Sequence, residues 1–391
     1  MSQFALPPYA LGSPQSPESK VAVVLLLAVC FLAWSNGAND NFKGVASLYG
    51  SGTASYRVCL AWATVTTLAG SAAACFLAAE LLKKFSGNGL VPSSLAATDS
   101  FAVAVATGAG LTVLFAARVG MPISTTHALT GAMLGSGWMA VGGQVDLGVL
   151  GRAFVLPLLL GPVAAVALGA LLYVALHGLR LRLGISQDWC LCAGEEAPVR
   201  IAPLPPSAGA VAFTGSGLSV SVGTPTECAQ RYSGRVLGLD SQQVIGTAHF
   251  LTAGLVSFAR GLNDTPKMAG LLLVLPALGV RSSMLVLGVC IAVGGILGAR
   301  RVAETMSHKI SAMNPGQGLA ANISTGLLVL GASTLGLPVS TTHVSVGSIV
   351  GIGLTGQSPP NRSVVRSIVL AWVVTLPCAA ASAAVVFALL P

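Results

Sequence analysis

Long apolar stretches separated by short polar segments make up most of this chain. A helix of about 20 apolar residues spans the hydrocarbon core of a bilayer, so stretches of this length predict membrane helices. Five lie in the first part of the chain, at 21–38, 57–82, 97–117, 122–141 and 150–177. Five more follow, at 244–262, 282–299, 318–337, 338–356 and 366–390, and a shorter apolar run at 268–278 predicts a half-helix.

The pattern predicts four parts of the chain. Residues 1–20 form a polar tail, 21–177 a first membrane repeat, 178–243 a Gly-, Pro- and Ser-rich hydrophilic insert, and 244–391 a second membrane repeat. The apolar run that begins at Val21 has no small-residue cleavage site, so we interpret it as the first membrane segment rather than a signal peptide.

The composition excludes most soluble classes. Charged residues make up 8% of the chain, where soluble proteins have about 25%. Stretches near 20 residues favour helices over a β-barrel, whose strands alternate over about ten residues. The net charge of +8 fits basic loops on one side of a membrane, so lipid is the expected partner and nucleic acid is not.

Two polar signatures occur twice, in the same order. Residues 37–43 read Gly-Ala-Asn-Asp-Asn-Phe-Lys, and residues 261–267 read Gly-Leu-Asn-Asp-Thr-Pro-Lys. Residues 122–127 read Pro-Ile-Ser-Thr-Thr-His, and residues 338–343 read Pro-Val-Ser-Thr-Thr-His. Five segments per half is an odd number, which inverts the second half relative to the first. We therefore predict an all-α integral membrane protein with about ten to twelve transmembrane segments, two inverted-topology repeats, and broken or re-entrant helices.

The Asn-Asp pairs are candidate cation ligands. A carboxylate in an apolar segment is costly and marks an ion path by default, although a single copy equally fits a helix end at the interface. Gly37 and Pro266 mark places where a helix can break and expose carbonyl oxygens beside the pairs. These hard oxygens suit a small cation such as Na⁺. The cation-binding candidates are Asn39, Asp40, Asn263 and Asp264.

The Ser-Thr-Thr runs are candidate anion sites. Proline followed by hydroxyl side chains predicts a helix start, and the N-terminus of a helix attracts an anion. Ordinary capping explains one such run, whereas two matched runs favour a two-fold pocket. The substrate-binding candidates are Ser124, Thr125, Thr126, Ser340, Thr341 and Thr342.

The lysine and histidine of each signature have several interpretations. Lys43 and Lys267 follow each Asp by three residues, so they can pair with it, supply charge for an oxyanion, or extend to the interface. We include both among the substrate-binding candidates. For His127 and His343 a structural hydrogen bond is favoured over titration.

These four motifs resemble the duplicated signatures of the PiT family of inorganic phosphate transporters. The resemblance covers both repeats and implies a cation-coupled oxyanion symporter that uses Na⁺ or H⁺, without another cofactor and without catalytic residues. It also implies that the Asn-Asp pairs bind the cation and the hydroxyls hold the oxyanion. The common family pattern after Asn-Asp is Val-Ala-Asn-Ala, whereas this chain has lysine in both copies.

Several functions remain open at this point. The first is phosphate import by alternating access, and the alternative is a proton-coupled sulfate permease of the same family. An intramembrane enzyme and an ion channel are rivals from other classes, and duplication argues against the enzyme. A homodimer is also left open.

The basic residues predict the orientation of a multi-pass protein in the plasma (cytoplasmic) membrane. If both termini lie outside and the insert is cytoplasmic, twelve Lys and Arg residues lie inside and five outside, with Lys43, Arg260 and Lys267 left out because they belong to the motifs. The inside set is Arg57, Arg118, Arg180, Arg182, Arg200, Arg231, Arg235, Arg300, Arg301, Lys309, Arg362 and Arg366. The outside set is Lys20, Lys83, Lys84, Arg152 and Arg281.

Overall fold

The computed structural model describes residues 17–87, 89–184, 189–196, 218–224, 226–227, 232–356 and 359–390. The first repeat contains α1 (Pro17–Asp40), α2 (Ala46–Gly50), α3 (Tyr56–Leu77), α4 (Ala79–Lys84), α5 (Ser93–Ala96), α6 (Asp99–Arg118), α7 (Thr125–Val141), α8 (Leu147–Val149) and α9 (Leu156–Arg182). The second contains α11 (Ser241–Ala269), α12 (Val280–Gly298), α13 (Arg300–Glu304), α14 (Pro315–Thr334), α15 (Thr341–Thr355) and α16 (Arg362–Leu389). Within the described residues, six helical segments are long and apolar enough to cross a membrane, which fits the predicted fold class.

The helices of the two repeats pack as matched pairs. Helix α1 packs against α12 and α6, and its counterpart α11 packs against α3 and α14. In the same way α7 packs against α16, and α15 packs against α9. Each contact thus has a counterpart in which the two repeats exchange roles, as inverted repeats require.

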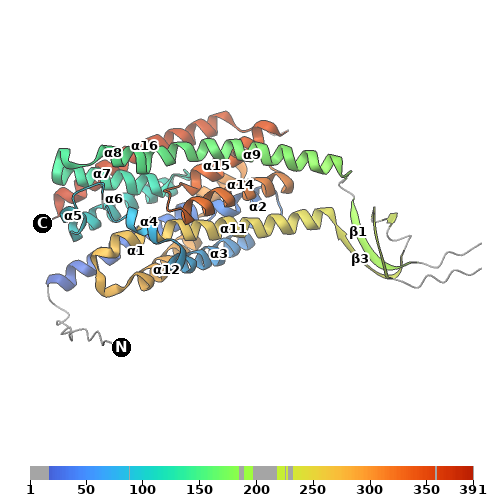
Figure 1. Cartoon of the computed structure of the whole chain (residues 1–391), viewed down its shortest axis with the longest axis horizontal. Helices are drawn as coiled ribbons and strands as arrows, with labels where there is room; N and C mark the ends of the chain where they lie inside the picture. Colours follow the sequence, from blue (N-terminus) through green and yellow to red (C-terminus); the bar gives the residue numbers. More distant parts are fainter. Residues whose placement is uncertain are drawn as a thin grey trace, which may run out of the picture.

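Helices α7 and α15 are too short to cross the bilayer alone. At about 1.5 Å per residue they measure about 25 and 22 Å, less than the hydrocarbon core of about 30 Å. The pair α6 and α7 lies toward the end of the bundle where α1 begins, and α14 and α15 lie toward the opposite end (Figure 1). The sequence predicted membrane helices from 122 and from 338. Instead the polypeptide is non-helical up to Ser124 and Ser340, and each helix begins at the following threonine.

Other sequence-based boundaries also differ from the structure. Helix α3 ends at Leu77 rather than near 82, because Ala78 leaves the helical conformation with φ −126° and ψ 32°. Helix α1 continues through Gly37 to Asp40, and α11 continues through Pro266 to Ala269, so neither residue breaks its helix as the sequence predicted. The half-helix predicted at 268–278 is wrong, since 3₁₀ turns form at Gly270–Val274 and Pro276–Leu278.

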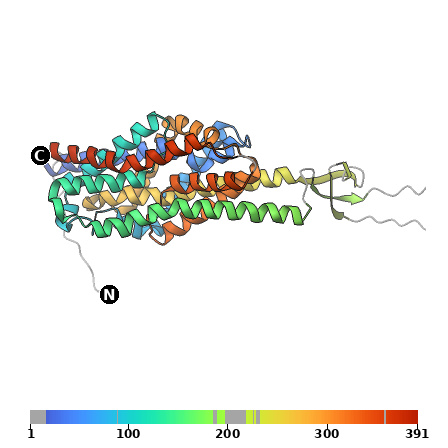
Figure 2. The same cartoon turned by 90° about the horizontal axis from the view of Figure 1, so that it is seen from above.

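The insert between the repeats contains a small antiparallel sheet. Its strands are β1 (Cys190–Glu196), β2 (Leu218–Gly223) and β3 (Tyr232–Asp240), in the order β2-β1-β3. The sheet lies beyond the helical bundle, at the end opposite to the start of α1 and the end of α16 (Figures 1 and 2). The start of α1 and the end of α16 therefore share one end of the molecule and the insert the other. Much of the predicted tail and insert, including Arg200 and Arg231, lies outside the described residues.

Matched glycines allow the closest helix contacts. A Cβ added at Gly37 on α1 would lie 2.0 Å from the Ile291 carbonyl oxygen on α12. One added at Gly261 on α11 would lie 2.2 Å from the Thr67 carbonyl oxygen on α3. Small residues let membrane helices approach closely, and these two sit beside the Asn-Asp pairs. The two glycines therefore fix the depth at which each pair enters the bundle.

Replacing Gly37 or Gly261 with alanine is expected to lower the melting temperature of the detergent-solubilised protein by several degrees. The methyl group has no room, and overpacking costs about 1–3 kcal/mol. The control is Gly331→Ala on α14, where an added Cβ meets nothing within 4 Å. Equal melting temperatures for Gly261→Ala and Gly331→Ala would contradict this account.

Candidate functional site

The two Asn-Asp pairs meet in the middle of the bundle. The side-chain amide of Asn36 donates to Asp40 Oδ2 at 2.8 Å and to Asp264 Oδ2 at 3.4 Å, so one amide links the carboxylates of both repeats. Asp40 is 1% exposed and Asp264 3%. Asn263 is fully buried and donates to Asp264 Oδ1 at 2.8 Å. The sequence placed these residues as a pair of sites, and the fold joins them into one cluster.

Both motif lysines are buried within this cluster. Lys43 forms an ion pair with Asp40, and Lys267 forms one with Asp264 at 3.4 Å. Lys43 is 3% exposed and Lys267 1%, so extension to the interface, one of the three interpretations, does not occur. Pairing with the preceding Asp is the interpretation that the geometry supports.

Each lysine also reaches across to the other repeat. Lys43 Nζ donates to Thr342 Oγ1 at 2.5 Å and to the Ile123 carbonyl at 2.7 Å. Lys267 Nζ donates to Thr126 Oγ1 at 2.7 Å and to the Val339 carbonyl at 2.7 Å. The two sets of contacts are matched, which makes the lysines cross-links between the repeats.

The carbonyl oxygens of the site come from the segments before α7 and α15. The sequence placed exposed carbonyls at breaks beside the Asn-Asp pairs, but the ones that bind side chains belong to Met121, Ile123 and Val339. These segments follow glycines with left-handed backbones, Gly120 at φ 73° and Gly336 at φ 67°. Residues with a side chain rarely adopt such a backbone conformation. Glycine therefore permits the chain to turn after α6 and after α14 and to begin a new helix.

The serines of the two runs cap the helices that follow. Ser124 Oγ accepts from the backbone amide of His127 at 3.2 Å, and Ser340 Oγ accepts from that of His343 at 3.2 Å. These are N-caps of α7 and α15, which orient two helix N-termini into the centre of the protein. Capping was the alternative to oxyanion binding for these serines.

The threonine hydroxyls join the repeats. Thr126 donates to the Val339 carbonyl at 3.1 Å, and Thr342 donates to the Ile123 carbonyl at 2.7 Å. Thr125 donates to Asp40 Oδ2 at 3.0 Å. These hydroxyl protons are used within the protein, so oxyanion binding requires that some of these contacts exchange.

Replacing Thr126 and Thr342 together with valine is expected to weaken oxyanion binding at least tenfold. Valine keeps the shape but removes the donor, and each lost hydrogen bond to a charged group costs about 1.5–3 kcal/mol. Binding of labelled phosphate to the purified variant would measure the change. Unchanged affinity with a lower melting temperature would restrict these hydroxyls to holding the two repeats together.

Sequence reasoning did not name Asn36 or Arg260 as site residues, although both belong to the same cluster. Arg260 Nη1 donates to Asn36 Oδ1 at 3.3 Å, and Nη2 donates to Asn41 Oδ1 at 3.0 Å and Thr67 Oγ1 at 2.9 Å. The guanidinium is 1% exposed, and its Nε has no hydrogen-bond partner among the described residues. Both residues lie three positions before the Asn of their motif. A polar residue at the same position in both apolar stretches was the sequence feature that could have identified them.

The charges of the cluster do not balance. Lys43, Lys267 and Arg260 are three cations, whereas the carboxylates are the two of Asp40 and Asp264. An uncompensated charge away from water is costly, so a buried net positive charge favours an anionic ligand. The two helix N-termini add positive potential at the same place.

The two motif histidines meet at the pseudo-two-fold axis. Their ring centroids are 4.5 Å apart, and His343 also lies 3.8 Å from the ring centroid of Trp372. His343 Nδ1 is 3.4 Å from the Leu158 carbonyl, which fits the favoured structural role. Trp372 Nε1 donates to the Pro122 carbonyl at 3.2 Å, so this stack holds the start of the first Ser-Thr-Thr segment.

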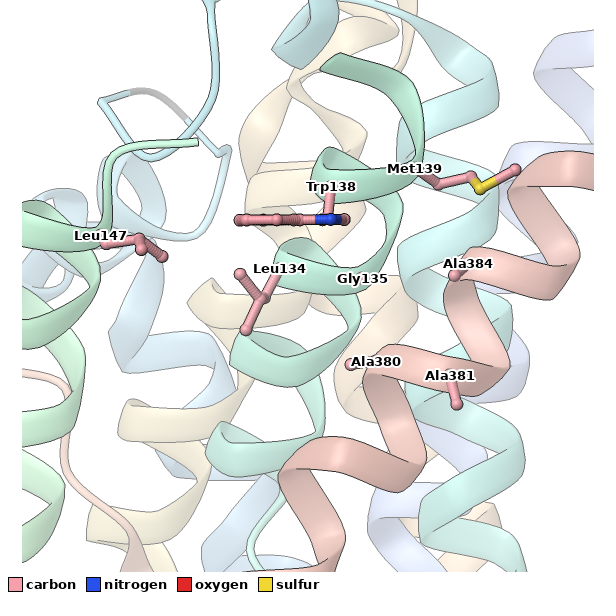
Figure 3. Close-up of a pocket in the computed structure, with 8 residues that line it drawn as sticks. All are labelled: Leu134, Gly135, Trp138, Met139, Leu147, Ala380, Ala381 and Ala384. Atoms are coloured by element: carbon pink, nitrogen blue, oxygen red, sulfur yellow. The ribbon is translucent and has the colours of Figure 1, made fainter. Parts of the chain in front are cut away.

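Two surface cavities lie away from the charged cluster. One of about 390 Å³ lies between α7 and α16, and Figure 3 shows Leu134, Trp138 and Ala380 among the apolar side chains that line it. The other, of about 420 Å³, is lined by Trp34 and Ala38 of α1 and by three arginines, Arg118, Arg300 and Arg301. None of the residues that line either cavity belongs to the charged cluster.

Comparison with known proteins gives matches over nearly the whole chain. The model of a family described as "Phosphate transporter family" matches residues 36–383. A protein of Pyrococcus horikoshii named "Putative phosphate permease" is 27% identical, over 94% of this chain and 97% of its own length. A protein of the same description from Thermococcus kodakarensis is 27% identical over 92% of this chain and 95% of its own length. A solved structure titled "The sodium-dependent phosphate transporter" has a TM-score of 0.72 at 22% identity, and the match covers 95% of this chain and 98% of that one.

Proposed function

The chain belongs to the phosphate transporter family, and from this premise we propose that it carries inorganic phosphate across the membrane by symport with Na⁺ or H⁺. The observation that carries the proposal is the buried cluster of three cations and two carboxylates, which lies where two helix N-termini meet. Such a cluster favours a bound anion, and its position between inverted repeats suits a carrier.

The charge balance favours phosphate over sulfate. One uncompensated positive charge matches a monovalent oxyanion, and phosphate has a monovalent form near neutral pH whereas sulfate does not. A sulfate dianion would exceed the charge of the cluster itself and, without a co-bound cation, leave a buried net negative charge, which is costly. A sulfate permease of the same family stays the alternative.

Alternating access would use the contacts that join the repeats. The hairpin of α6 and α7 and that of α14 and α15 lie toward opposite ends of the bundle (Figure 1). Their tips are held together by the hydroxyl and lysine cross-links of Thr126 and Thr342. Opening toward one side would break these links and expose the cluster to that side, and rocking of one repeat against the other is the motion we propose.

Uptake by proteoliposomes tests the function. We expect labelled phosphate to accumulate when an inward Na⁺ or H⁺ gradient is imposed, and excess unlabelled phosphate to compete better than excess sulfate. Stronger competition by sulfate would favour the alternative. Flux that does not saturate would indicate a channel, and turnover of a substrate without net transport would indicate an enzyme.

The orientation also stays a proposal. The distribution of Lys and Arg favours external termini and a cytoplasmic insert. Cys192 in β1 is disulfide-bonded, which points the other way because disulfides are rare in the cytoplasm. Single cysteines introduced into the insert would be labelled in intact cells with a membrane-impermeant maleimide to determine the orientation. We expect no labelling before the cells are permeabilised.

A further inference from the structure

The ammonium group of Lys43 lies inside a set of oxygen ligands. Its Nζ contacts a carboxylate oxygen of Asp40, the amide oxygen of Asn39 at 2.8 Å, the Ile123 carbonyl at 2.7 Å and the Thr342 hydroxyl at 2.5 Å. Carboxylate, amide, carbonyl and hydroxyl oxygens are the ligands that hard metal cations take in proteins. The oxygens that the sequence assigned to a dissolved cation thus bind a cation that belongs to the chain.

The second repeat repeats this arrangement. Lys267 Nζ contacts the Thr126 hydroxyl and the Val339 carbonyl, each at 2.7 Å, and Asp264 Oδ1 at 3.4 Å. The Asn263 amide oxygen accepts instead from Ser333 at 3.1 Å, so this lysine has one oxygen fewer than its counterpart. Two matched positions, one in each repeat, are therefore filled by lysine ammonium groups.

A dissolved cation could not share either position. It would lie within a few ångströms of a buried ammonium, and like charges at that distance repel each other strongly where water is excluded. The carboxylate that would attract the ion is already paired. Arg260, which is 1% exposed and bonded to Asn36, adds a third positive charge to the same cluster.

We propose that Lys43 and Lys267 occupy the two positions where a coupling cation would otherwise bind, so that oxyanion binding by this protein requires no Na⁺. This inference rests on the proposed function, because it concerns how the oxyanion site obtains its positive charge. Of the two coupling ions named above, it leaves H⁺ to drive uptake.

Phosphate binding to the purified wild-type protein is the first test. The dissociation constant would be measured in sodium chloride, potassium chloride and choline chloride at equal ionic strength. Coupled ligands typically change each other's affinity by about 5–150-fold. We expect the dissociation constant for phosphate to differ by no more than about twofold among the three salts. Na⁺ is also expected to leave the melting temperature equal to that in K⁺, since an ion that binds the native state raises it.

The double variant Lys43→Asn/Lys267→Asn is the second test. The shorter amides free the oxygens around Asp40 and Asp264, so we expect phosphate binding to become dependent on Na⁺ by at least about fivefold. The control is Lys83→Asn, because Lys83 also follows an acid, Glu80, by three residues but is 69% exposed. This control should bind phosphate like the wild type in all three salts. The single variant Lys267→Asn serves if the double variant does not fold.

The outcomes separate this inference from the proposed function. Wild-type binding or uptake that needs Na⁺ would overturn the inference and leave the phosphate carrier intact. A folded double variant that Na⁺ fails to restore, or that binds as the wild type does without Na⁺, would show that these are not cation positions. Absence of oxyanion binding and of uptake by the wild type in every salt would instead refute the proposed function.

Discussion

Replacing Asp40 with asparagine is expected to reduce phosphate uptake to background while the protein still reaches the membrane. The carboxylate pairs with Lys43 and accepts from Asn36 and Thr125, all within a site that is almost closed to solvent. An amide of the same shape removes the negative charge and leaves a buried ammonium without its partner. Breaking a buried ion pair in this way costs about 3–5 kcal/mol, which corresponds to a factor of about 100 or more in the equilibrium constant for forming the intact site.

Asp264→Asn should behave in the same way if the two repeats contribute equally. Uptake by proteoliposomes measures the effect, and size-exclusion chromatography in detergent shows whether the variant folds. Asp99→Asn, in the first turn of α6 and outside the cluster, is the matched control and should retain uptake. Near-normal uptake by both Asp40→Asn and Asp264→Asn would remove the carboxylates from the mechanism.

The arrangement of helices could be predicted because it follows from a duplicated pattern. The count of five apolar segments in each half included α7 and α15, which are too short to cross the bilayer alone. The inverted repeats are instead supported by the matched packing of α1 on α12 and of α11 on α3. The lengths of α7 and α15 were harder to predict. Residues 122–124 and 338–340 were read as the first turn of each helix because proline is common there, whereas the structure leaves them non-helical and begins each helix at the following threonine.

The sequence indicated most residues of the cluster, without Asn36 and Arg260, but not the contacts between them. The pairing of Lys43 with Asp40 follows from a spacing of three residues, which is a local property. The contact of Lys43 with Thr342 joins positions 299 residues apart, and no spacing in the sequence indicates it. Cross-links between repeats arise from the way two hairpins meet, so the three interpretations of the lysines could not be separated in advance.

Arg260 shows where the two-fold symmetry of the site is broken. Its counterpart in the first repeat is Asn36, and the two side chains hydrogen-bond to each other across the axis. All other charged residues of the cluster occur in matched pairs, within the part of the chain that the structure describes. The net positive charge of the site therefore depends on this single unmatched arginine. A motif comparison overlooks such a residue, because it searches for what the halves share.

Replacing Arg260 with glutamine is expected to weaken phosphate binding by about 10- to 100-fold, since a hydrogen bond to a charged group contributes about 1.5–3 kcal/mol. Glutamine retains donors for Asn36 but leaves two cations against two carboxylates, so the preference of the cluster for an anion is lost. Arg260→Lys keeps the charge and should retain more affinity than Arg260→Gln. The control is Arg281→Gln, whose guanidinium lies over the Phe76 ring at 5.2 Å, away from the cluster. Phosphate titrations of the three purified variants, with their melting temperatures, give the comparison. If Arg260→Lys and Arg260→Gln lose stability equally and keep wild-type affinity, the arginine holds helices together and the charge of the site has another origin.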